Sequence, residues 1–146
     1  GMGVAEVEGA NGGLHTNYAG KVEAAVNALT KENYDFVYIH VEAPDEMGHQ
    51  GSVDRKVKAI EYLDEKVIKP VVDNLQAENV DFRMLILPDH PTPIRVRTHT
   101  SDSVPYMLYD STNPLDTTWN YNEEEAKESG NFIAKGHEMI DYLFSK

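Results

Sequence analysis

The sequence contains no cysteine, which excludes disulfide bonds, thiolate metal ligands and cysteine nucleophiles together. Basic residues are also scarce: 13 Lys and Arg stand against 25 Asp and Glu, so the formal net charge is −12 at pH 7. With no basic cluster to follow a phosphate backbone, a nucleic-acid partner is not expected. No apolar run approaches the roughly 20 residues that cross a bilayer, and no signal segment is recognisable. These absences favour a cytoplasmic location without membrane contact.

Length and composition are sufficient for one folded core. The chain has 146 residues, of which 40% are hydrophobic. Four β-prone stretches, at residues 4–7, 36–41, 82–87 and 104–109, alternate with helical patterns. The stretch 36–41 is nearly continuous in apolar residues, as expected of a strand that is covered on both faces. This alternation predicts an α/β fold with a largely parallel sheet.

Helical periodicity is present in three places. Residues 21–29 have an apolar face, and a final helix carries Ile133, Ile140, Leu143 and Phe144. Between them, apolar residues recur at steps of three and four at Val53, Val57, Ile60, Leu63, Val67 and Val71. Because proline lacks an N–H group and collides with the preceding turn, Pro70 is expected to kink or break the end of this helix.

Residues at the expected helix ends support these boundaries. Ser52 is a suitable N-cap for the helix that starts near residue 53. Asn122 and Glu125 have the spacing of a capping box, and Gly130 suits the position just after a helix end.

Aspartate and histidine gather in three segments next to the expected strands. Asp45 and His49 follow the strand at 36–41, Asp89 and His90 follow the strand at 82–87, and His99 precedes the third strand. Ligands of open α/β sheets bind beyond the carboxyl ends of the strands, so two of these segments point to one rim. On a helical turn, Asp45 and His49 would face a single ion, whereas Gly48 would also permit a tight loop. The plain alternative is that these are ordinary loop residues that share no ligand.

Oxygen and imidazole donors without sulfur suit Mn²⁺, Zn²⁺, Fe²⁺ or Mg²⁺. Five candidate ligands exceed the need of one tetrahedral ion, so the pattern indicates two neighbouring divalent ions. Paired metals about 3.5–4 Å apart clamp the attacking and leaving oxygens in phosphoryl transfer.

Three ordered motifs carry a resemblance to a known family. They are VYIHVEAPDEMGH at residues 37–49, LPDHPTP at 87–93 and THTSDSVP at 98–105. In content and order they resemble the archaeal-type cofactor-independent phosphoglycerate mutases, metalloenzymes of the alkaline phosphatase superfamily. The resemblance runs through essentially all of residues 1–146. It implies the C-terminal portion of a three-layer sheet with helices on both faces.

The resemblance also implies roles for these residues. It places Asp45, His49 and His99 on one metal ion and Asp89 and His90 on a second. Manganese is the expected ion, with zinc or magnesium as alternatives, and no 2,3-bisphosphoglycerate is required. The implied reaction converts 3-phosphoglycerate to 2-phosphoglycerate in glycolysis through a phosphoserine. The nucleophilic Ser belongs to an N-terminal part that these residues do not include, together with the inserted substrate domain. No catalytic residue is therefore assigned here, and the isolated chain is expected to be inactive.

Several alternatives stay open. The same scaffold could transfer phosphate to another substrate, as proposed for a homoserine kinase branch. A non-catalytic half-domain that binds metal or associates with itself is a second possibility. His40 is interpreted as a structural or outer histidine, and Glu42 and Glu46 as either outer partners of the ligands or solvated acids. Arg95 and Arg97 are interpreted as a solvent-facing pair. The expected partners are a small phosphorylated substrate and the missing N-terminal part.

Overall fold

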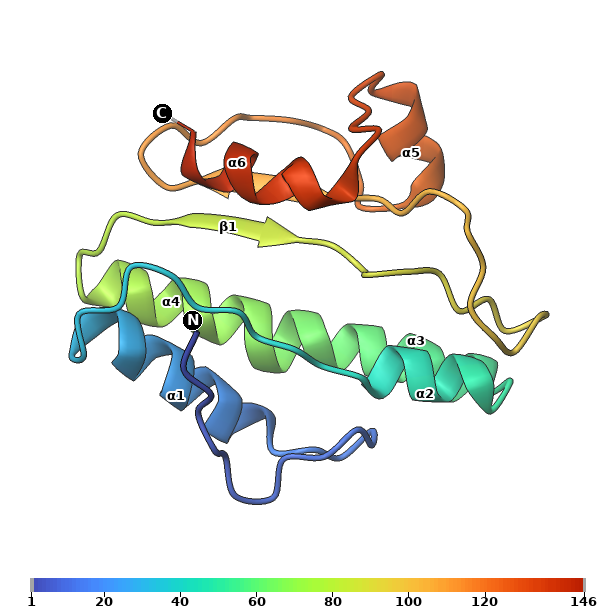
Figure 1. Cartoon of the computed structure of the whole chain (residues 1–146), viewed down its shortest axis with the longest axis horizontal. Coiled ribbons are helices and arrows are strands. Elements are labelled where there is room, and N and C mark those ends of the chain that lie inside the picture. The colour runs from blue at the N-terminus through green and yellow to red at the C-terminus, as the bar shows by residue number, and fades with distance from the viewer. Residues whose placement is uncertain (1, 146) are drawn as a thin grey trace. The chain divides into compact units, whose positions relative to one another are not determined.

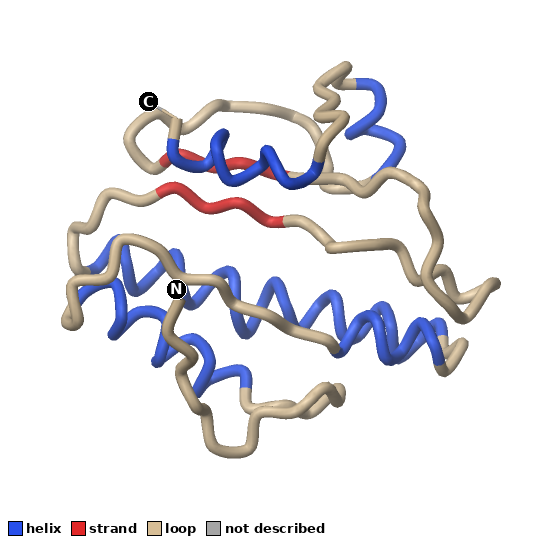
Figure 2. Tube along the Cα trace, viewed as in Figure 1, coloured by secondary structure: helices blue, strands red, loops and turns tan. Residues whose placement is uncertain are grey.

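The structure, a computed structural model, describes residues 2–145 and divides into two compact units (Figures 1 and 2). The first unit comprises the chain up to Val80 together with Thr92–His99. The second comprises Asp81–Pro91 together with the chain from Thr100 onward.

The first unit is helical. Its elements are α1 (Tyr18–Thr30), α2 (Ala43–His49), α3 (Val53–Leu63), a π-helical segment η1 (Asp64–Ile68) and α4 (Lys69–Ala77). Figure 1 shows α1 lying beside α4. No helix within residues 2–145 combines the length and apolar character needed to cross a membrane.

Two small groups of buried side chains hold this unit together. One joins α1 to η1 and α4 through Val22, Ala25, Val67, Val71 and Leu75. The other joins α2 to α3 through Leu14, Ala43, Met47 and Ala59. The second group anchors the helix that carries Asp45 and His49. Val53, Val57 and Ile60, which form one apolar face of α3, are instead more than half exposed.

The irregularity expected at Pro70 is present, but it neither breaks nor ends the helix. The π-helical segment η1 lies immediately before α4, in which Pro70 is the second residue. A wider turn accommodates a proline ring that would otherwise collide with the carbonyl four residues earlier. Within η1, the Lys66 ammonium lies 3.5 Å from the centre of the Tyr62 ring. The helix then continues to Ala77.

The second unit contains a two-stranded sheet and short helices. Strands β1 (Arg83–Ile86) and β2 (Met107–Asp110) pair in antiparallel register, with Arg83 opposite Asp110. The helices are α5 (Glu123–Glu128), the 3₁₀ segment η2 (Gly136–Glu138) and α6 (Met139–Phe144). Helix α6 packs against β1.

The expected helix ends are confirmed. The Glu125 backbone N–H donates to Asn122 Oδ1 at 2.8 Å, as a capping side chain requires. Gly130 follows α5 with φ +72°, a conformation that glycine adopts without steric cost. Ser52 occupies the N-cap position of α3, but its side chain makes no capping hydrogen bond there.

The strand predictions are correct only in part. The stretch 82–87 contains β1 and the stretch 104–109 overlaps β2, but 4–7 and 36–41 are not strands in this structure. A β-prone sequence forms a strand only when a neighbour accepts its backbone hydrogen bonds, and β1 and β2 pair only with each other among the described residues. The observed pair is antiparallel rather than parallel. The architecture is thus mixed α and β, and the three-layer arrangement stays a prediction.

Candidate metal centre

Helix α2 presents Asp45 and His49 on the same side. Pro44 near its start lacks an N–H, which costs nothing in the first turn because those donors have no partner within the helix. Residues four apart on a helix are neighbours, and His49 Nε2 lies 3.3 Å from Asp45 Oδ2. The sequence left open whether this segment forms a helix or a tight loop, and the structure shows a helix.

The loop Thr92–His99 brings a third side chain to this pair. His99 Nε2 lies 3.2 Å from His49 Nε2 and 3.4 Å from Asp45 Oδ1. Ligand atoms about 2.0–2.1 Å from one tetrahedral ion are roughly 3.3–3.4 Å apart. Asp45 faces His49 with Oδ2 and His99 with Oδ1, and each of these distances is close to the spacing of two ligands on one ion. The side chains are about one-third to one-half exposed, so their donor atoms are accessible from solvent.

The backbone around Arg97 determines the tautomer of His49. His49 Nδ1 lies 3.0 Å from the Arg97 carbonyl oxygen. A carbonyl only accepts hydrogen bonds, so Nδ1 must carry the proton, and in the neutral ring Nε2 keeps its lone pair. That is the nitrogen facing Asp45 and His99. Such a carbonyl contact is the usual outer partner of a metal-binding histidine.

Thr92 orients the Asp45 carboxylate. The Thr92 hydroxyl donates a short hydrogen bond to Asp45 Oδ1. The Lys56 ammonium donates to the Thr92 carbonyl at 2.6 Å, and Thr92 is only 4% exposed. A Cβ atom on Gly48 would lie 2.5 Å from that same carbonyl, so only glycine permits this approach. The loop that bears His99 is thereby fastened to the helices that bear Asp45 and Lys56.

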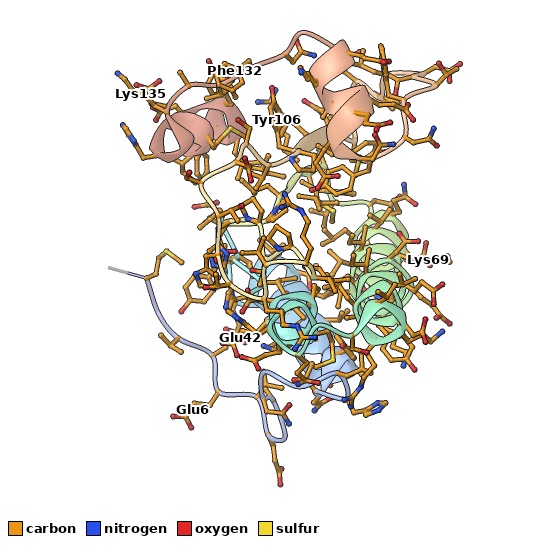
Figure 3. The ribbon with its side chains drawn as sticks, turned by 90° about the vertical axis from the view of Figure 1, so that its right-hand side faces the viewer. Glu6, Glu42, Lys69, Tyr106, Phe132 and Lys135 are labelled. Carbon is orange, nitrogen blue, oxygen red and sulfur yellow. The ribbon has the colours of Figure 1, made fainter. Side chains whose placement is uncertain are left out.

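The histidine before α2 lies outside this cluster. His40 Nε2 pairs with Glu42 Oε1 at 3.5 Å, and the His40 carbonyl accepts from the Lys21 ammonium at 2.8 Å. Glu42, labelled in Figure 3, is the N-cap residue of α2. These contacts agree with a structural role for His40.

Asp89 and His90 belong to the second unit, just beyond β1. His90 Nε2 lies 3.3 Å from Asp89 Oδ2, and the His90 backbone N–H donates to Asp89 Oδ1 at 3.0 Å. These two adjacent side chains therefore contact each other at the strand end. Ligation of a metal by any of the five residues stays a prediction.

Sequence reasoning missed Thr92, Lys56 and Arg97 as parts of this site. Thr92 is separated from Asp45 by 47 positions and Arg97 from His49 by 48, so no local periodicity connects them. Arg97 has a positive φ of 59°, unusual for a side chain with a Cβ atom. The available signal was the Pro-Thr-Pro segment, whose prolines restrict the backbone around Thr92.

Comparisons with known proteins identify relatives of this chain. A 2,3-bisphosphoglycerate-independent phosphoglycerate mutase of Methanosarcina mazei is 43% identical over 144 residues, which cover 98% of this chain and 36% of that protein. A probable enzyme of the same name from Geobacter sulfurreducens is 42% identical over 147 residues, again 36% of its length. The chain therefore spans little more than a third of these relatives.

A solved structure and a family model also match nearly all of this chain. The PH0037 protein from Pyrococcus horikoshii matches with a TM-score of 0.81 and 30% identity, over 98% of this chain and 42% of that one. The model of the Metalloenzyme superfamily matches residues 1–146. The resemblance noted in the three motifs is thus confirmed, and the chain belongs to the Metalloenzyme superfamily.

Proposed function

We propose that this chain is the metal-binding C-terminal portion of a cofactor-independent phosphoglycerate mutase. The reaction interconverts 3-phosphoglycerate and 2-phosphoglycerate through a phosphoserine whose Ser lies outside residues 1–146. The observation that carries the proposal is the cluster of Asp45, His49 and His99, in which two imidazole nitrogens and a carboxylate lie 3.2–3.4 Å apart. The names of the relatives supply the reaction.

The donor set fits a divalent cation. Asp45, His49 and His99 would hold one ion, and Asp89 with His90 would contribute to a second. When bound, such ions neutralise phosphate charge and lower the pKa of the attacking hydroxyl. Manganese is the proposed ion, since imidazole with carboxylate suits it as well as zinc.

The chain's own residues prepare this site before an ion arrives. The Arg97 carbonyl holds the Nδ1 proton of His49, so Nε2 is available as a donor. The Thr92 hydroxyl directs one oxygen of Asp45. A preset donor arrangement loses less conformational entropy when the ion binds.

A chimera tests the function directly. This chain would replace the matching 144-residue segment of the Methanosarcina mazei relative, and interconversion of the two phosphoglycerates would be assayed with Mn²⁺ and without 2,3-bisphosphoglycerate. We expect an active enzyme. Asp45→Asn and His99→Ala should each lower kcat at least about 100-fold, since each removes a donor. His137→Ala, an exposed histidine of the second unit, is the matched control and should leave activity unchanged.

Three outcomes would contradict the proposal. A folded chimera that binds Mn²⁺ but leaves 3-phosphoglycerate unchanged would show that this segment does not serve a mutase. Phosphate transfer to homoserine by that same protein would favour the kinase alternative. Full activity in His99→Ala would show that the cluster is not part of the active site.

A further inference from the structure

Arg97 has a backbone conformation that residues with a Cβ atom seldom adopt. Its φ is 59°, in the left-handed region. Two hydrogen bonds fix this conformation: the Arg97 N–H donates to the Pro93 carbonyl at 2.8 Å, and the Arg97 carbonyl lies 3.0 Å from His49 Nδ1. Strained residues of this kind concentrate at ligand-binding sites, where the surrounding contacts hold them in place. Arg97 lies directly beside the candidate metal centre.

The Arg97 guanidinium lies against Gly51, just beyond the end of α2. A Cβ atom on Gly51 would be 2.7 Å from Cζ and 2.9 Å from Nη2 of Arg97. The glycine therefore leaves the room that the guanidinium occupies. Since α2 ends at His49, Arg97 contacts this end of the helix twice, with its carbonyl at His49 and with its guanidinium at Gly51.

The Arg97 side chain has no anionic partner among residues 2–145. No carboxylate pairs with its guanidinium there, and no acceptor takes a hydrogen bond from it, although Asp and Glu outnumber Lys and Arg by 25 to 13. The residue is exposed. A guanidinium presents a planar fork of N–H donors that matches two oxygens of a phosphate group. These donors are available to a ligand that approaches the end of α2.

We propose that Arg97 binds the phosphoryl group of a phosphomonoester at the cluster of Asp45, His49 and His99. The inference rests on the proposed function in placing a phosphomonoester at this cluster. The chain has a net charge of −12, which repels such a ligand at a distance. A guanidinium beside the cluster offsets this repulsion where the phosphate oxygens would lie. Because Gly51 and the left-handed backbone already position the guanidinium, it loses little freedom on binding.

The structural alternative is that Arg97 only stabilises α2. A cation near the C-terminal end of a helix interacts favourably with the helix dipole. That role predicts a loss of folding stability or of Mn²⁺ binding when the charge is removed, because His49 is the last residue of the same helix. It predicts no separate effect on phosphate binding.

Calorimetric titration of the chain with inorganic phosphate, at saturating Mn²⁺, tests the proposal. In Arg97→Gln we expect phosphate affinity to fall at least about 10-fold, since charged hydrogen bonds are lost. Mn²⁺ affinity should stay within about 3-fold of the wild type, because the Arg97 carbonyl still holds His49. Arg97→Lys keeps the charge without the fork and should be intermediate. Arg95→Gln, at an exposed arginine of the same loop, is the matched control and should leave phosphate affinity unchanged.

A change at Gly51 separates the position of the guanidinium from its charge. Gly51 has φ +69°, and asparagine tolerates this region better than most residues with a Cβ atom. Gly51→Asn should therefore displace the guanidinium and weaken phosphate binding although Arg97 is still present. Combining Gly51→Asn with Arg97→Gln should weaken binding no further than Arg97→Gln alone, because both changes remove the same contact. Additive losses would overturn the proposal.

Three further results would overturn it. The first is unchanged phosphate affinity in Arg97→Gln, or no phosphate binding by the wild-type chain with Mn²⁺ present. The second is an equal loss in Arg95→Gln, which would show a general effect of charge. The third is a parallel loss of Mn²⁺ and phosphate binding in Arg97→Gln, which would favour the structural role at α2.

Kinetics of the chimera separate this inference from the proposed function, because phosphate binding needs no turnover. In an active chimera, Arg97→Gln should raise KM for 3-phosphoglycerate by a larger factor than it lowers kcat. Phosphate binding that depends on Arg97 in a chain whose chimera is inactive would support the inference and contradict the mutase. An active chimera in which Arg97→Gln changes neither KM nor kcat would support the mutase and overturn the inference.

Discussion

The orientation of the Asp45 carboxylate depends on residues that are not themselves candidate metal ligands. Thr92 donates to Asp45 Oδ1, and Lys56 in turn holds the Thr92 carbonyl. A carboxylate with one oxygen held by a hydroxyl has less rotational freedom, so both oxygens keep their directions towards His49 and His99. Thr92 is therefore a positioning residue whose loss should weaken metal binding without removing a donor.

Calorimetric titration of the chain with Mn²⁺ measures this effect. We expect one ion on the Asp45 cluster, binding lost in His99→Ala, and affinity about 10-fold lower in Thr92→Val, which keeps the shape but lacks the hydroxyl. Thr92→Ser restores the hydroxyl and should bind within about 3-fold of the wild-type affinity, a smaller loss than that of an outer partner. Equal affinities for the valine and serine variants would show that packing alone explains Thr92.

The residue pattern of the candidate site was predictable only where it is local. The four-residue spacing of Asp45 and His49 allowed both to lie on one helix face, and the structure has His49 Nε2 3.3 Å from Asp45 Oδ2. His99 entered through its motif, because no spacing rule connects a loop histidine to a helix 50 residues away. Thr92 and Arg97 were missed because their roles depend on how a loop returns to α2.

At the scale of secondary structure, helices were predicted better than strands. Helical periodicity and caps are properties of one segment, so α1, α3 and the Asn122 cap could be read from their own residues. A strand depends on a second strand. Residues 37–41 have the side-chain alternation but pair with no strand among residues 2–145, whereas β1 pairs with β2.

The pairing of β1 with β2 includes an ionised group with a strongly lowered pKa. Hydrogen bonds from the Thr112 hydroxyl and N–H, with a further one from Arg83 at 2.7 Å, lower the pKa of Asp110 to about 2. Its ordinary value is 3.8. A lowered pKa in the folded state means that the carboxylate stabilises the fold above pH 3.8, and that this contribution disappears as the pH falls towards 2.

Comparing the wild type with Asp110→Asn isolates this contribution from the other acidic groups. Urea unfolding followed by the fluorescence of Trp119, which lies in the same unit, reports on this sheet. We expect the wild type to be the more stable at pH 6, and the difference to shrink between pH 4 and pH 2. A difference that stays constant over this range would contradict the proposed hydrogen bonding of Asp110.

At the scale of the whole molecule, each unit exposes large apolar side chains. In the first unit Val53, Val57 and Ile60 form one face of α3 and are 51–58% exposed. In the second unit the exposed apolar residues include Leu108, Phe132, Ile140, Tyr142 and Phe144. Contiguous exposed apolar faces are unusual in proteins that work as monomers and mark surfaces that another part covers. The chain matches only 36% of the length of its relatives, so additional chain is available in them to cover such faces.

The apolar face of α3 should therefore cause the isolated chain to self-associate. Light scattering coupled to size-exclusion chromatography should give a mass above 16.4 kDa that increases with salt, because salt screens the repulsion between copies of charge −12. The double change Val57→Gln with Ile60→Gln should shift the mass towards that of a monomer. Glu61→Gln, on the same helix but at a polar position, is the matched control and should leave the association unchanged or slightly stronger.

A wild-type chain that is monomeric at every salt concentration would contradict the prediction that this apolar face causes self-association. Association that survives the double change would instead place the contact on the second unit.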